Sequence, residues 1–142
     1  GRGGVGGEGV GRGSGVGRRG GAAGSALGAN VTAMVTNREK LAAAFAKHGA
    51  AVDDPVWRLP LWRPYRKLIE STVADIVNTG SMPLGGAITA ALFLEAFVED
   101  AIDWAHFDIM AWNLSSMPGR PEGGEAMAMR AAFAVLAERY SG

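Results

Sequence analysis

His106 and Asp108 are the residues whose types and spacing come closest to a site for chemistry. They stand two positions apart in the run 104–109, which is typical of a strand, so their side chains would share one face. Such a pair can bind a metal or exchange a proton as acid and base. Because no third ligand is evident nearby in the sequence, we expect instead a buried histidine whose ring nitrogens are hydrogen-bonded.

A glycine-rich tract at the start offers two further motifs. Gly15–Gly20 matches the dinucleotide-binding fingerprint, but that site needs a preceding strand, which this tract does not predict, so we expect no nucleotide there. Arg2–Gly4 and Arg19–Gly21 are Arg-Gly-Gly units, which can hold single-stranded RNA through charge and stacking. Two such units without interleaved aromatic residues also fit a solvated tail or a sequence artefact.

Bases and aromatic side chains alternate over residues 57–67, as they do on some nucleic-acid-binding surfaces. Pro55, Pro60 and Pro64 favour a different interpretation, because three prolines exclude a regular helix. We therefore predict an ordered loop pinned by buried tryptophans, with arginines packed over the rings.

Composition excludes several classes of site. The 142 residues include no cysteine, which rules out disulfides, a cysteine nucleophile and thiolate zinc sites, and only two histidines. Hydrophobic residues make up 48%, enough for a core, yet no apolar run approaches the roughly 20 residues of a membrane span. With no signal peptide evident and a formal net charge of zero, we expect a cytoplasmic protein without a membrane or nucleic-acid partner.

The charge balance hides a sharp division at residue 24. Residues 1–24 contain 13 glycines and four arginines against one acid, whereas the remaining residues carry a net charge of −3. A segment this rich in glycine cannot bury enough apolar surface to offset its ordering entropy. We predict that residues 1–24 are disordered and that the folded part, residues 25–142, becomes ordered near Ala26.

The folded part alternates helical and extended patterns, which predicts an α/β fold. We expect helices over 38–48, 64–70, 87–98 and 122–140, strands over 72–77 and 104–109, and loops between them. Asn37 is placed to cap the first helix and Gly49 to end it.

Two of these helices have distinctive apolar patterns. The helix over 87–98 has one charged residue, Glu95, among its twelve residues and should be buried nearly all round. In the last helix one face should be formed by Ala126, Met129, Phe133, Leu136 and Tyr140.

Four stretches in this order resemble the carboxy-terminal part of the leucyl (cytosol) aminopeptidase family, from about Ala26 to Tyr140. They are Asp-Pro-Val-Trp-Arg-Leu-Pro-Leu-Trp at 54–62, Gly-Gly-Ala-Ile-Thr-Ala-Ala-Leu-Phe-Leu at 85–94, Trp-Ala-His-Phe-Asp-Ile at 104–109 with Ala111-Trp112, and Gly119-Arg120-Pro121 with Gly123-Gly124.

The resemblance implies an α/β catalytic domain, with a mixed sheet between flanking helices, in a cytoplasmic homohexamer. Members use two divalent metal ions, zinc or manganese, to hydrolyse the N-terminal residue from a peptide substrate. The family's metal-binding signature, Asn-Thr-Asp-Ala-Glu-Gly-Arg, is absent here, and Asn78-Thr79-Gly80 lacks its carboxylates. The resemblance therefore assigns this chain no catalytic residue and no metal ligand.

Only pocket-wall positions carry over from the family. Side chains just after the His-x-Asp-Ile strand wall the pocket for the departing residue, which implies this role for Met110 and Asn113. A Thr-Gly-Ala turn of the family corresponds to Gly20-Gly21-Ala22, which places Gly21 at the pocket with the threonine lost. Plain core packing is the alternative for these residues.

The leading hypothesis is thus an incomplete metallo-aminopeptidase domain, with a parent reaction that releases N-terminal, leucine-like residues and no activity expected from this chain alone. We hypothesise that residues 1–24 come from a shifted reading frame, because GC-rich codons out of frame yield Gly, Arg, Ala and Val. The alternative is a non-catalytic α/β interaction module whose Gly/Arg tail contacts RNA or a partner.

Overall fold

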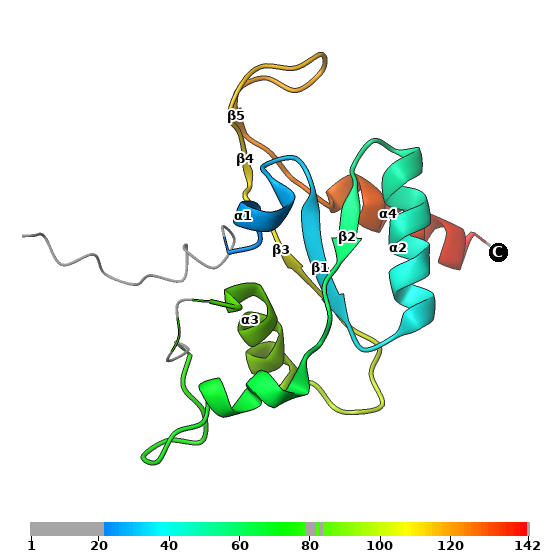
Figure 1. Cartoon of the computed structure of the whole chain (residues 1–142). Helices are drawn as coiled ribbons and strands as arrows, with labels where there is room; N and C mark the ends of the chain where they lie inside the picture. Colours follow the sequence, from blue (N-terminus) through cyan, green and yellow to red (C-terminus); the bar gives the residue numbers. More distant parts are fainter. Residues whose placement is uncertain (1–21, 79–81, 83, 142) are drawn as a thin grey trace, which may run out of the picture.

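The computed structural model describes residues 22–78, 82 and 84–141 (Figure 1). Residues 1–21, which include both Arg-Gly-Gly units and Gly21, lie outside these residues, so the predicted disorder and RNA contact of the Gly/Arg tract stay predictions. The elements are α1 (Gly24–Leu27), β1 (Thr32–Thr36), α2 (Glu39–Ala51), β2 (Val56–Arg58), the 3₁₀ helix η2 (Arg63–Leu68), α3 (Gly86–Glu95), β3 (Ala105–Asp108), β4 (Trp112–Asn113), β5 (Gly123–Gly124) and α4 (Met129–Tyr140).

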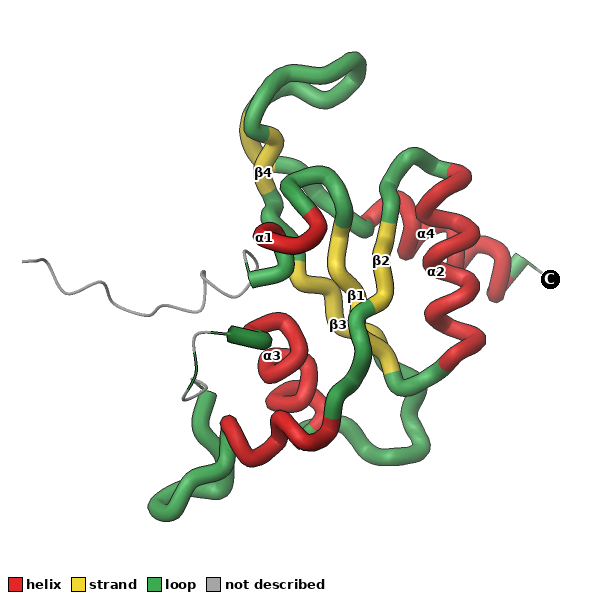
Figure 2. The backbone as a smooth tube through the Cα atoms, viewed as in Figure 1, coloured by secondary structure: helices red, strands yellow, loops and turns green. Residues whose placement is uncertain are grey.

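A three-stranded mixed sheet in the order β2-β1-β3 forms the centre of the fold (Figure 2). β1 runs parallel to β2, with Thr32 opposite Val56, and antiparallel to β3, with Val35 opposite His106. β1 is buried along its whole length because strands flank it on both sides. The α/β fold with a mixed sheet and flanking helices is confirmed.

The larger core lies between the sheet and the pair α2 and α4. Met34 of β1 contributes to a buried cluster there, and Phe107 of β3 meets Phe45 of α2 edge-on, with ring centroids 4.9 Å apart. A smaller cluster of Ala23, Ala33 and Ala87 joins α1 and α3 to the opposite face of the sheet. Helices therefore cover both faces, as Figure 1 shows.

Three extended segments differ from the sequence prediction. Residues 72–77 are bends and irregular chain, not a strand, and Val73 is 94% exposed. Their β-branched residues find no neighbouring strand, and tertiary context overrides the propensity. The central strand β1 and the short strand β2 were not predicted, whereas the predicted strand 104–109 is confirmed as β3.

Helix α2 begins and ends differently from the prediction. Asn37 does not cap it. The Asn37 side chain instead donates to the Ile102 carbonyl and accepts from the Trp104 backbone N–H, and so connects the end of β1 to the segment just before β3. Gly49 does not end the helix, which continues to Ala51. A Cβ at Gly49 would lie 2.7 Å from the Asp54 carbonyl oxygen, so the glycine permits a close approach of the chain.

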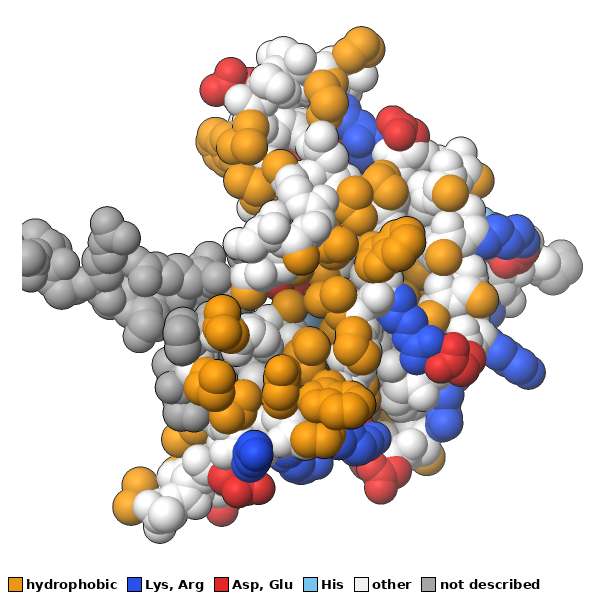
Figure 3. Space-filling view, in the orientation of Figure 1, with side chains coloured by type: hydrophobic (Ala, Val, Ile, Leu, Met, Phe, Trp, Pro, Cys, Tyr) orange, Lys and Arg blue, Asp and Glu red, His pale blue; other side chains and the backbone are white. Residues whose placement is uncertain are grey.

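The predicted burial of two tryptophans is wrong. Trp57 and Trp62 are 63% and 53% exposed, and Trp57 lies on β2, an edge strand of the sheet. Arg58 and Arg63 do not pack over the rings and instead pair with Glu39 and Glu95. Figure 3 shows hydrophobic side chains gathered over α3 and the segment that joins β2 to η2.

The remaining helices match the prediction in part. The helix expected over 64–70 is the 3₁₀ helix η2, and α3 ends at Glu95, before the predicted limit of residue 98, with Leu94 and Phe97 exposed. α4 begins at Met129 because residues 122–128 form β5 and turns. Among the described residues no helix combines the length and apolarity needed to cross a membrane.

Candidate functional site

Residues next to the two predicted pocket-wall segments meet at the end of β3. The backbone N–H of Ala23, at the start of α1, donates to Asp108 Oδ2 at 3.2 Å. The start of α3 lies beside them, since a Cβ at Gly86 would come within 3.1 Å of the Ala22 Cβ. Gly21 lies outside the described residues, but its neighbour Ala22 is thus held beside the strand that leads to Met110.

Met110 follows β3 and presents a side chain that is 39% exposed. The next residue, Ala111, has a φ of +57°, a left-handed conformation that turns the chain sharply into β4. The thioether of Met110 is apolar and adaptable, which suits a wall that contacts apolar side chains of varied shape. The sequence prediction of a pocket wall is not tested by this geometry and remains a proposal.

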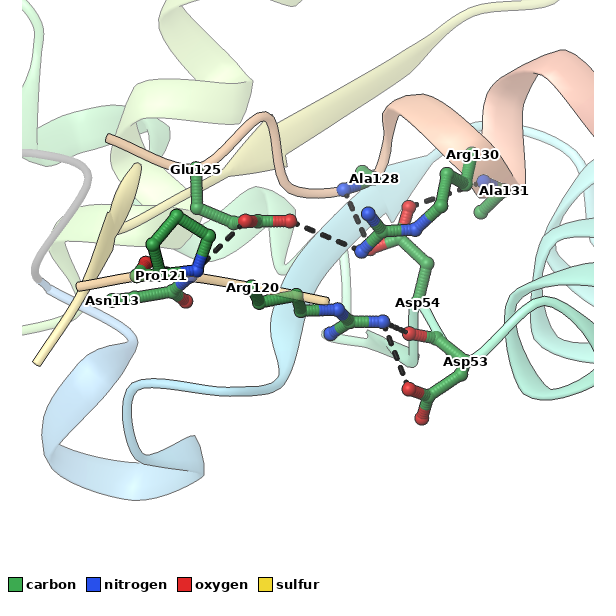
Figure 4. Close-up of polar contacts among 9 residues, drawn as sticks. All are labelled: Asp53, Asp54, Asn113, Arg120, Pro121, Glu125, Ala128, Arg130 and Ala131. Atoms are coloured by element: carbon green, nitrogen blue, oxygen red, sulfur yellow. Dashed lines mark hydrogen bonds and ion pairs between the residues drawn. The ribbon is translucent and has the colours of Figure 1, made fainter. Parts of the chain in front are cut away.

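Asn113 is buried and its amide is engaged within the chain. Its Nδ2 donates to the Pro121 carbonyl and to Glu125 Oε2, each at 3.1 Å, and so fastens β4 to the segment around β5 (Figure 4). Sequence reasoning missed this structural role. A buried asparagine beside a Gly-Pro-rich hairpin was the available signal, because such a side chain must find local partners.

A second polar network, which the sequence reasoning missed, centres on Asp54. Its buried carboxylate accepts from the backbone N–H groups of Ala128 at 2.9 Å and Ala131 at 3.1 Å, and so caps the first turn of α4 from a distant part of the chain. Arg120 donates to both the carbonyl and the carboxylate of Asp53 (Figure 4). Together these contacts hold the β4–β5 hairpin and α4 against the loop before β2.

His106 and Asp108 share one face of β3, as predicted, and lie on the side of the sheet that α1 and α3 cover. Burial lowers the pKa of His106 and raises that of Asp108, although the Ala23 N–H partly offsets the second shift. The buried Nε2 of His106 has no hydrogen-bond partner within the described part of the chain, so the expectation of a fully satisfied histidine is wrong.

The described residues do not fit a two-metal centre. Within residues 22–78, 82 and 84–141, no three histidine, aspartate or glutamate side chains group so that they could hold a metal ion. Several acidic residues pair with cations of the chain: Glu95 accepts from Arg63 at 2.9 Å, and Asp103 from Arg38 at 2.5 Å. Asp108 is tied to the α1 backbone.

A mixed sheet covered by helices on both faces defines an α/β domain. The chain belongs to the cytosol aminopeptidase family: residues 18–133 match the family described as cytosol aminopeptidase family, catalytic domain. The match includes the end of the Gly/Arg tract, from residue 18.

Curated relatives agree with this assignment. A probable cytosol aminopeptidase of Desulfotalea psychrophila is 48% identical over 100 residues, covering 69% of this chain and 20% of the relative. A probable cytosol aminopeptidase of Nitratidesulfovibrio vulgaris is 40% identical over 115 residues, covering 80% of this chain and 22% of the relative. The chain thus spans about a fifth of the length of these relatives.

Solved structures share the fold. The cytosol aminopeptidase of Coxiella burnetii is 55% identical with a TM-score of 0.77, over 84% of this chain and 26% of that one. The bottromycin maturation enzyme BotP, solved in complex with Mn, is 35% identical with a TM-score of 0.78, over 83% of this chain and 26% of BotP. Family membership and the aminopeptidase fold predicted from the four sequence stretches are therefore confirmed.

Proposed function

We propose that this chain supplies the scaffold and part of the substrate-pocket wall of a metallo-aminopeptidase that releases N-terminal, leucine-like residues from peptides. The observation that carries the proposal is the family match over residues 18–133. It is supported by the contact between the start of α1 and the end of β3, where the Ala23 N–H donates to Asp108 two residues before Met110.

In this proposal the chain's own residues bind and orient rather than react. Met110 and the backbone around Gly21 contact the apolar side chain of the departing residue and exclude water from it. Asn113 keeps the β4–β5 hairpin in place through its two amide hydrogen bonds. Asp54 holds the first turn of α4 through two backbone N–H groups.

The two divalent metal ions, manganese or zinc, would supply an activated water and polarise the scissile carbonyl. We assign no step through them to this chain, because its described residues do not form a site of that kind. We therefore expect the chain alone to have no aminopeptidase activity. The proposed cellular setting is the cytoplasm, within a homohexamer, with peptide as the substrate and no membrane or nucleic-acid partner.

Turnover of leucine p-nitroanilide tests the proposal. The purified chain, supplied with manganese, should release no p-nitroaniline above the uncatalysed rate and should retain no manganese after gel filtration. A full-length cytosol aminopeptidase assayed in parallel serves as the positive control. Metal-dependent turnover by the chain alone would contradict the assignment of a scaffold part.

A further inference from the structure

Asp108 carries a buried carboxylate at the last residue of β3. Its Oδ2 accepts a hydrogen bond from the backbone N–H of Ala23 at 3.2 Å, across 85 residues of the chain. Both residues are buried. Removing a carboxylate from water is costly, and an apolar side chain would fill the same space at lower cost. What the carboxylate contributes, and an apolar side chain could not, is this hydrogen bond to the start of α1.

Helix α1 is a single turn without a cap from its own segment. Ala23, at the N-cap position, has no side chain that can accept a hydrogen bond. The Ala23 carbonyl accepts from the N–H groups of Ala26 and Leu27, whereas the Ala23 N–H donates to Asp108. So short a helix is not stable by itself. The position of α1 therefore depends on what holds its first residues against the sheet.

The residue before the N-cap, Ala22, occupies a tight place beside α3. A Cβ added at Gly86 would lie 3.1 Å from the Ala22 Cβ, so the glycine leaves the room that Ala22 takes. Next to it, Ala23 packs with Ala33 and Ala87 in the smaller core cluster. Contacts between methyl groups limit how closely elements approach but have little directional preference. The hydrogen bond to the β3 carboxylate supplies the direction.

We propose that Asp108 is a positioning residue of the substrate pocket. Its carboxylate fixes the start of α1 against the end of β3, and so sets the place of Ala22, the neighbour of the predicted pocket residue Gly21, relative to Met110. This inference rests on the proposed function, which assigns Gly21 and Met110 to the pocket wall. Asp108 acts through the backbone of α1 and not on the substrate itself.

Few ionisable groups face this carboxylate. His106 lies on the same face of β3, apolar residues of β1 lie opposite the pair, and α1 has no ionisable residue. The ionisable residue of α3 is Glu95, at the far end of that helix, where it pairs with Arg63. Burial raises the pKa of Asp108, and the hydrogen bond from Ala23 opposes the rise. Because an ionised carboxylate is the stronger acceptor, protonation of Asp108 should weaken the contact with α1.

Nuclear magnetic resonance of the full chain tests the proposal. In wild type the Ala23 amide should be protected from hydrogen exchange, and the Ala22 methyl should show a nuclear Overhauser contact with the α-protons of Gly86. Asp108→Ala should abolish that contact and reduce the protection of the Ala23 amide about tenfold or more, as loss of a hydrogen bond to a charged group does. Asp108→Asn keeps an acceptor oxygen and should retain both signals. Asp100→Asn, at an exposed position before β3, is the matched control and should change neither.

A pH titration gives a readout that packing alone would not produce. The shift of the wild-type Ala23 amide proton should titrate with a midpoint above the ordinary aspartate value of 3.8, and Asp108→Asn should remove that titration. This measurement decides if Asp108→Ala does not fold, because it uses only wild type and the conservative variant. An Ala23 signal that titrates identically in Asp108→Asn would overturn the proposal.

The exchange data can overturn it independently. Unchanged protection of the Ala23 amide in folded Asp108→Ala would do so, as would an equal loss in Asp108→Asn. A lost Ala23 hydrogen bond that leaves the contact between Ala22 and Gly86 intact would show that Asp108 does not set the place of Ala22. Turnover of leucine p-nitroanilide by the chain alone would instead count against the proposed function, and would leave the measured role of Asp108 at α1 unchanged.

Discussion

Asp54 Oδ2 accepts a hydrogen bond from the backbone N–H of Ala131 at 3.1 Å, although 77 residues separate them in the chain. With the second bond, from Ala128 to Oδ1, this single buried carboxylate serves as the N-terminal cap of α4. The residue at the helix's own N-cap position, Ala128, has no side chain that could do so. The loop before β2 thus determines where the last helix begins.

Replacing Asp54 with alanine should destabilise the fold. The change leaves two buried N–H groups at the start of α4 without acceptors, which costs about 2 kcal/mol or more of the free energy of unfolding. Asp54→Asn retains one acceptor oxygen and should lose less. Asp75→Ala, at an exposed position, is the control. Chemical denaturation measures the free energy of unfolding of each variant. Equal losses of that free energy for Asp54→Ala and Asp75→Ala would contradict the capping role.

Gly49→Ala should destabilise the protein even though alanine favours helices. The new Cβ would lie 2.7 Å from the Asp54 carbonyl oxygen, so the loop that carries the α4 cap must shift. We expect a loss of about 1–3 kcal/mol, typical of overpacking. Gly24→Ala, where no atom lies within 4 Å of the added Cβ, should be neutral or slightly stabilising. A thermal melt of both variants decides, and a stabilised Gly49→Ala protein would refute the steric argument.

The ion pairs between α2 and α4 should make stability depend on pH in acid. Hydrogen bonds from Lys47 and His48 lower the pKa of Glu138 to about 2. Because the folded pKa lies below the ordinary value of 4.5, this contribution is present above pH 4.5 and disappears as the pH falls toward 2. Glu138→Gln should therefore be less stable than wild type at pH 6 and equal to it near pH 2.

The effect of Glu138 should be modest, since the carboxylate is exposed and salt screens it. Melts at pH 2, 4 and 6, each at low and high salt, measure it. A difference between wild type and Glu138→Gln that persists undiminished at pH 2 would show that the contact is not electrostatic.

His106 should make the fold less stable as the pH falls below about 6.5. Burial lowers the pKa of His106, so the unfolded chain binds a proton more readily than the folded one in this range. The folded protein favours the neutral imidazole of His106, so acidification shifts the folding equilibrium toward the unfolded state. His106→Leu should flatten the dependence between pH 5 and 7.

Leucine should fit this position because the buried Nε2 has no hydrogen-bond partner among the residues that the structure describes. The free energy of unfolding, measured by urea titration at pH 5, 6 and 7, provides the comparison. A wild-type slope that survives in His106→Leu would assign the pH dependence to other groups.

Particular elements show how far sequence reasoning reached. The apolar run before the acidic residues 99–103 predicted α3, and the run 104–109 predicted β3, because local composition and buried position agree there. The strand expected over 72–77 failed, since strand propensity has no effect without a neighbouring strand. β1 was missed because apolar and polar residues hardly alternate along it. The strand is nevertheless fully buried, since β2 and β3 flank it in the sheet.

For the candidate site, the sequence identified Met110, Asn113 and Gly21 only through the family resemblance. It did not predict that the Ala23 N–H would bind Asp108, or that Asn113 would be engaged by Pro121 and Glu125. Those contacts join residues whose proximity depends on how α1, β3 and the hairpin pack.

The sequence by itself determined the family, the α/β class and the amphipathic pattern of α4, since these depend on residue types and short spacings along the chain. Only the tertiary structure decided which face of α4 is covered, where that helix begins and which carboxylates are engaged. The physical reason is that burial and hydrogen bonding are satisfied between segments far apart in the chain: α2 takes the small-residue face of α4, Asp54 caps it, and Phe133 is left exposed.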